Sequence, residues 1–248
     1  MKQMSIAGLC LAAVCVFSAG AASSASAAEL LARPAGGGSI AGVTFLSSAT
    51  LALLTTIGGS LMHCKGATNL GLFLSATLGN ILIRFLGCST KVISNELCNT
   101  SGAGPGEIHL PLSTLFHVGL AHLTSATAGV PAAVVLLGKN VVLQCSSLAT
   151  LEIRGALIGA LQKNGTAVPL NTAITDVNLN FQETTPTSHG LQHLRLFLMP
   201  GTTGLTTYDL ESNLNGGAFE LVAEVVNALL DGFKLPSGKE DAIEFVEP

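Results

Sequence analysis

The densest set of ligand-type side chains in this 248-residue chain lies near its C-terminus. Oxygen ligands at positions 1, 3, 5 and 12 of a twelve-residue loop, with a bidentate carboxylate at the last position, are typical of a flexible Ca²⁺ site. The sharp turn of such a loop requires glycine where this chain has Leu214, and no helix pair is evident on either side. An acidic hairpin turn is therefore favoured, with calcium as the alternative. The residues concerned are Asp209, Glu211, Asn213, Asn215 and Glu220.

Two histidines form the second candidate. His189 and His193 are four residues apart, so they share a face on either a strand or a helix. Such a pair can bind a metal or supply a base, although surface or hydrogen-bonded loop histidines are the favoured interpretation. The chain has no GxSxG, HExxH, P-loop or Rossmann motif. A Ser-His-Asp triad assembled in space stays open, but the sequence favours a non-catalytic protein without a cofactor.

The first 27 residues have the organisation of a signal peptide. Lys2 gives a positive start, residues 6–16 are apolar, and Ala25-Ser26-Ala27 is a small-x-small cleavage pattern. We therefore expect secretion, with a mature chain that begins at Ala28. Residues 28–48 read as a linker and lead-in segment because Arg33–Ser39 is rich in glycine. Residues 49–248 are expected to form one β-rich domain.

Cysteine usage agrees with export. Two of the six cysteines lie inside the signal, which leaves Cys64, Cys88, Cys98 and Cys145. An even number in an exported chain predicts two disulfides, and the absence of a CxxC spacing disfavours zinc.

Loop lengths and apolar runs favour one pairing of these cysteines. We expect Cys88–Cys98, which would close a short polar excursion, together with Cys64–Cys145 at the ends of two apolar runs. The alternative is Cys64–Cys88 with Cys98–Cys145.

The distribution of charge limits the classes of molecule that the protein could bind. From residue 176 to the C-terminus there are eleven acidic and three basic residues, which argues against nucleic acid because phosphate binding needs clustered lysine and arginine. After the signal, no apolar segment has the length of a membrane helix.

The rest of the chain is a series of short runs rich in Val, Ile, Leu and Thr, separated by turn residues. This pattern predicts an all-β fold, a sandwich or barrel of many short antiparallel strands. Residues 219–233 favour helix by propensity, whereas Asn215-Gly216-Gly217 favours a hairpin, and both remain open. The expected strands are 50–56, 60–64, 80–86, 107–118, 132–137, 141–145, 148–154, 174–181, 191–198 and 242–246.

Several segments between Leu51 and the C-terminus together resemble a family of uncharacterised secreted bacterial proteins with many paralogues in soil actinobacteria. The resemblance implies export, a β-rich domain and paired cysteines, and it brings no assigned activity. The matching segments are 56–60 leading to Cys64, 85–88, Cys98 with 106–108, 144–145, 153–159 and 211–220.

These features favour a secreted, non-catalytic β domain that serves in binding, adhesion or cell-surface structure. An apolar-ligand carrier or a self-assembling surface protein is one alternative, because residues 35–145 carry few charges to discourage association of strand edges. A secreted hydrolase is the other. Carbohydrate binding is disfavoured because the chain has no Trp and one Tyr for stacking on sugars. A closed barrel with an apolar interior would favour the carrier.

Overall fold

A computed structural model describes residues 30–56, 59–91, 95–145, 149–182 and 192–247. Every regular element in these ranges is a β-strand, and every pairing between strands is antiparallel, which confirms the all-β prediction. The predicted signal peptide and His189 lie outside these ranges.

The strand pairings close into a first ring of eight strands. Each strand pairs with the next, and the last returns to the first. In ring order they are β2 (Thr44–Ala49), β5 (Gly66–Phe73), β6 (Leu78–Leu86), β10 (Leu115–His122), β11 (Val130–Leu136), β13 (Ala149–Lys163), β15 (Val177–Phe181) and β19 (Glu220–Lys234).

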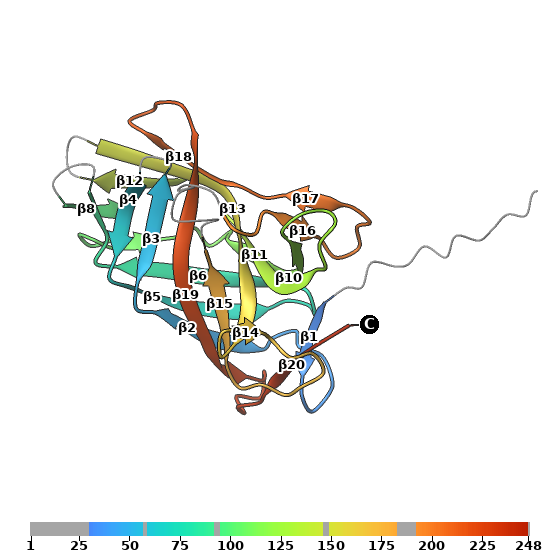
Figure 1. Cartoon of the computed structure of the whole chain (residues 1–248). Helices are drawn as coiled ribbons and strands as arrows, with labels where there is room; N and C mark the ends of the chain where they lie inside the picture. The colour runs from blue at the N-terminus through green and yellow to red at the C-terminus, as the bar shows by residue number, and fades with distance from the viewer. Residues whose placement is uncertain (1–29, 57–58, 92–94, 146–148, 183–191, 248) are drawn as a thin grey trace, which may run out of the picture.

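A second ring shares the two longest strands with the first. Strands β13 and β19 have 15 residues each. One half of each strand pairs with strands of the first ring, and the other half pairs with strands of the second (Figure 1). Starting from β19, the second ring continues through β3 (Ala52–Thr56), β4 (Gly59–Cys64), β7 (Ser89–Thr90), β8 (Glu96–Thr100) and β12 (Val141–Cys145), then β13 and β18 (Leu210–Leu214).

Four further short strands pair with strands of the rings or extend from them. Strands β9 (Ile108–His109) and β14 (Thr166–Ala167) pair with β6 and β13. Strands β16 (Leu196–Leu198) and β17 (Leu205–Thr207) extend the sheet from β10. The expected strand at 107–118 is interrupted between β9 and β10, where Pro111 lacks an N–H for the ladder.

For its described residues 30–48, the structure corrects the expected linker and lead-in segment at 28–48. Strand β1 (Leu31–Pro34) pairs with β20 (Ile243–Val246), and β2 belongs to the first ring. Leu30 and Ala32 are fully buried. The glycines that indicated a linker lie in the turn after β1, so composition described a turn between two strands.

The segment 219–233, for which the sequence left helix and hairpin strand open, is a strand: residues 220–233 belong to β19, and residue 219 precedes it. Side chains at alternate positions face the interior, including Val222, Val226, Ala228 and Leu230. Asn215 and Gly216 have positive φ angles of 52° and 73° in the hairpin turn from β18, the geometry that favours Asn-Gly. The helical propensity was misleading because partners on both edges satisfy the backbone of β19.

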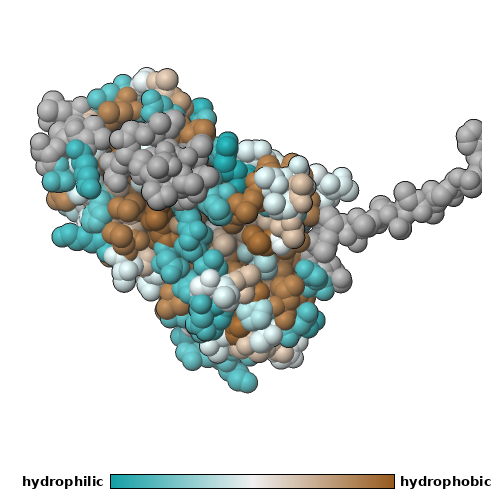
Figure 2. Space-filling model, in the orientation of Figure 1, coloured by the Kyte–Doolittle hydropathy of each residue, from teal (hydrophilic) through white to brown (hydrophobic). Residues whose placement is uncertain are grey.

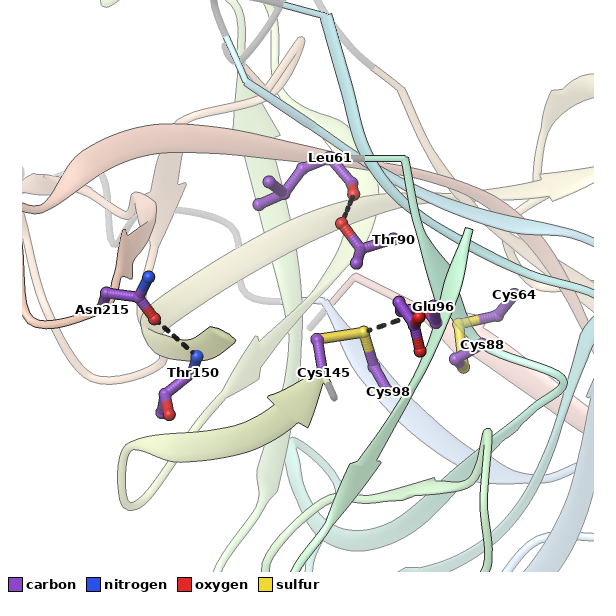
Figure 3. The surroundings of a disulfide bond; sticks show 9 residues. All are labelled: Leu61, Cys64, Cys88, Thr90, Glu96, Cys98, Cys145, Thr150 and Asn215. Atoms are coloured by element: carbon purple, nitrogen blue, oxygen red, sulfur yellow. Dashed lines mark hydrogen bonds between the residues drawn. A yellow bond between two sulfur atoms is a disulfide. The ribbon is translucent and has the colours of Figure 1, made fainter. Parts of the chain in front are cut away.

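The disulfides follow the alternative pairing, so the favoured pairing was wrong. Cys64 is bonded to Cys88 and Cys98 to Cys145, with Cα separations of 3.9 and 4.1 Å (Figure 3). Each bond joins neighbours in the second ring, since Cys98 lies opposite Cys145 across β8 and β12. Cys88 and Cys98 are also neighbours, joined by a backbone hydrogen bond of 3.0 Å. The pairing of the cysteines depends on which strands are neighbours in the closed second ring, and loop length does not reveal those neighbours.

Aromatic side chains fill the first ring away from the second. Phe45, Phe73, Phe116 and Phe233 lie with ring centroids 5.1–5.8 Å apart. A Cβ atom at Gly71 would lie 2.0 Å from the Phe45 ring, so glycine on β5 makes room for this packing.

Candidate functional site

The candidate site lies inside the protein, where the two rings meet. The alternation of β19 directs Val222, Glu224 and Val226 to the same interior face. Glu224 is thus a carboxylic acid in a row of apolar side chains.

Glu224 lines two cavities, one in each ring. Their volumes are about 50 and about 40 Å³ for the centre of a water-sized sphere, enough for a few waters or a small organic group, since one water needs roughly 10–15 Å³ by this measure. Phe85, Leu110 and Leu157 line both cavities with Glu224. The carboxyl therefore lies at the boundary between the cavities.

The surroundings of Glu224 raise its pKa to about 7 from its ordinary value of 4.5, because burial penalises the charged carboxylate. Within the described ranges, no hydrogen bond or ion pair compensates for this penalty. Glu224 keeps some accessible surface, and the cavities are where its side chain meets open space.

A second polar group lines the cavity in the first ring. The side-chain nitrogen of Asn69, on β5, donates a hydrogen bond of 3.0 Å to the hydroxyl of Ser47. The Oδ1 atom of Asn69 is buried and has no partner within the described residues. Buried acceptors are normally satisfied, so this oxygen is an exception among the described residues, although it presents almost no surface to the cavity that Asn69 lines.

On one edge of β19, the main chain of Glu224 is held by a side chain. Strand β18 pairs with this edge up to Val222 and β15 from Val226 onward, whereas on the other edge Glu224 lies opposite Leu54 of β3. In the amide orientation that satisfies both of its ends, Gln192 accepts from the Glu224 N–H at 2.7 Å and donates to the Gln182 carbonyl at 3.2 Å. Gln192 is buried and fixes the backbone at this position.

An outer groove adjoins the cavity in the first ring. It lies on β5, β6 and the segment after β9, with a volume of about 380 Å³ by the same measure. The groove and the cavity share Asn69, Ile83 and Leu110, so these side chains separate the interior from the surface. Arg84 lies on the groove and bonds Glu107 at 2.7 Å.

The structure does not bring the predicted calcium residues together. Asp209 is bonded by both ends of the Arg195 guanidinium, at 2.5 and 2.7 Å. Glu211 pairs with Arg154 at 2.8 Å. Asn213 donates to Glu152, Asn215 accepts from the Thr150 N–H, and Glu220 is exposed. No group of three or more His, Cys, Asp or Glu suited to a metal occurs in the described ranges.

The histidines lie apart from the interior cavities. His193 lines a surface cavity of about 270 Å³ together with Gln182 and Leu194, and its intended partner His189 is outside the described residues. His109 lies 3.3 Å from Glu107 on the outer groove. Burial lowers the pKa of His117. These three histidines thus occupy separate surroundings.

Sequence reasoning missed both Glu224 and Asn69. The available signal was one carboxyl within an alternating apolar run, Val222-Ala-Glu-Val-Val226. Considering this segment as a helix concealed the signal, because helical spacing assigns Glu224 to no particular face.

Comparisons with protein-family models, curated proteins and solved structures found no match for this chain. The resemblance to secreted actinobacterial proteins therefore stays a prediction. None of the described residues forms a helix that could span a membrane. The two disulfides are compatible with an extracellular protein.

Proposed function

We propose that this protein is an exported, non-catalytic binding protein that holds a small apolar ligand at the junction of its two rings. The observation that carries the proposal is the pair of adjoining cavities, lined by apolar side chains apart from Glu224 and Asn69. Ligand pockets in proteins have this composition, with a few polar groups that fix orientation.

The site favours binding over catalysis. General acid–base and nucleophilic mechanisms need a second reactive group within hydrogen-bond reach of the first. The described residues that line the two cavities include no histidine, serine, lysine or second carboxylate beside Glu224. Glu224 thus has the surroundings of an anchor for a ligand.

Export is the part of the proposal that rests on the sequence. The predicted signal peptide would deliver the chain to an oxidising compartment, where the disulfides Cys64–Cys88 and Cys98–Cys145 are stable. A binding protein outside the cytoplasm fits both features.

Ligand-dependent thermal stability tests the function. Small apolar molecules such as benzene, cyclohexane and 1-butanol are expected to raise the melting temperature of the mature protein, because they bind only the folded state. Ala52→Leu and Ala67→Leu, which add bulk to one cavity each, should abolish the shift. Ala218→Leu, at an exposed turn position, is the matched control. An unchanged melting temperature with every probe would refute the function.

Self-association is a second candidate, favoured by a row of exposed leucines. Leu46, Leu70 and Leu82 lie directly opposite one another across β2, β5 and β6. They are 54%, 47% and 42% exposed. Hydrophobic and hydrophilic side chains are also mixed on the face of the molecule that Figure 2 shows. A second copy would present the same row, as a two-fold interface requires. Sedimentation of the wild type and of the triple Leu→Ser variant tests this candidate, and a wild-type monomer at high concentration would refute it.

A further inference from the structure

We propose that the ligand is a small amine, whose apolar body fills the junction cavities and whose ammonium group is held by the Glu224 carboxylate. This inference rests on the proposed binding function and adds the chemical class of the ligand.

The carboxyl group of the site selects a hydrogen-bond donor. Glu224 offers two carboxylate oxygens to the cavities, and both only accept hydrogen bonds when the group is ionised. An ammonium group carries three donors and no acceptor, so it matches this carboxylate.

The charges of the site exclude an anionic head group. Each strand packed around Glu224 contributes uncharged side chains to the cavities, so no described lysine, arginine or histidine lining them could neutralise a ligand carboxylate. A fatty-acid head would meet the like charge of Glu224 in a poorly solvated space. A cation there gains an attraction that surrounding water weakens little. The uncharged neighbours are Leu54, Met62, Phe85, Val135, Leu157, Phe181 and Leu210.

The cavity size limits the apolar body to a short chain or small ring. The two volumes flank the carboxyl, so a head group at Glu224 leaves space for the body on either side. The outer groove gives a route, because Asn69, Ile83 and Leu110 line both the groove and the cavity in the first ring. An amine that passes these side chains would therefore enter the cavity that Glu224 lines.

Three probes of matched length test the head group: n-butylamine, 1-butanol and butyrate. Calorimetric titration of the mature protein at pH 8 should show butylamine binding about tenfold or more tightly than butanol, because hydrogen bonds to charged groups are the stronger kind. Butyrate should bind more weakly than butanol.

Variants assign the preference to Glu224. Glu224→Gln should reduce butylamine affinity by about tenfold or more while butanol affinity changes by less than about twofold, since only the charged contact is lost. Glu220→Gln, the same change at an exposed position of β19, should have no effect. Equal binding of butylamine and butanol to the wild type, or an unchanged preference in Glu224→Gln, would overturn the amine. If no probe binds, the proposed function itself fails.

Discussion

Glutamine at position 224 should stabilise the protein at alkaline pH. Glu224 is neutral in the folded protein at low pH and is forced to ionise in an apolar space as the pH rises. Glu224→Gln keeps the shape of the neutral acid and removes the ionisation. The variant and the wild type should therefore unfold with similar free energies near pH 4.5 and diverge above it.

The sign and size of the effect follow from proton linkage. The pKa of Glu224 is raised to about 7 in the folded state from 4.5, so between these values the folded state binds a proton that the unfolded state has released. The contribution of Glu224 to the free energy of unfolding is therefore fully present below pH 4.5, and it falls as the pH rises toward 7. At ~1.4 kcal/mol per pKa unit, the loss is about 3 kcal/mol by pH 8.

Urea unfolding measured at several pH values tests this expectation. Circular dichroism is the suitable probe because the chain contains no Trp and one Tyr. The quantity to compare is the difference in unfolding free energy between Glu224→Gln and wild type, since the surface carboxylates cancel in it. This difference should grow from near zero at pH 4.5 to about 3 kcal/mol at pH 8. A difference that does not change with pH would refute the partly buried, unpaired state of the Glu224 carboxyl, and Glu220→Gln should give a flat difference.

Three further predictions concern the frame and its export. Replacing Cys98 and Cys145 together by serine should cost about 4 kcal/mol of unfolding free energy in the chain-entropy model, because the bond closes a 47-residue separation; urea unfolding checks this, and unchanged stability would contradict it. Gly155→Ala should destabilise by at least about 2 kcal/mol, since Gly155 has a φ of 102° and a Cβ there would lie 2.1 Å from the Asp209 carbonyl oxygen; a melting temperature within one degree of wild type would be the opposing result. N-terminal sequencing of exported protein should read from Ala28, and a chain that still begins at Met1 would refute the signal peptide.

Local alternation made several strands predictable. The expected run 141–145 matches β12, and within the expected run 174–181 strand β15 buries Val177, Leu179 and Phe181 on one face. In such segments each residue's exposure follows from its neighbours in sequence. The all-β class was accessible for the same reason.

The closure of the strands into rings could not be predicted from the sequence, because it depends on strand partners that are far apart along the chain. Expected strand 148–154 covers only the first part of β13, whose second half pairs with different strands in the other ring. The cysteine pairing depends on the same closure. Spacing along the chain could suggest which cysteines were neighbours, but the order of strands around the second ring determined which neighbour each sulfur met.

The junction of the rings combines two features that both reduce stability. Alanines at positions 49, 52, 67 and 228 line the cavities, whereas four phenylalanines pack closely in the first ring. Empty volume costs stability in proportion to its size, and an unpaired carboxyl adds a cost of desolvation. A site that lacks both close packing and hydrogen-bond partners for its polar groups is typical of a functional site. A ligand with an apolar body and a cationic head would remove both costs at once, which is why the cavities and Glu224 are best understood as one site.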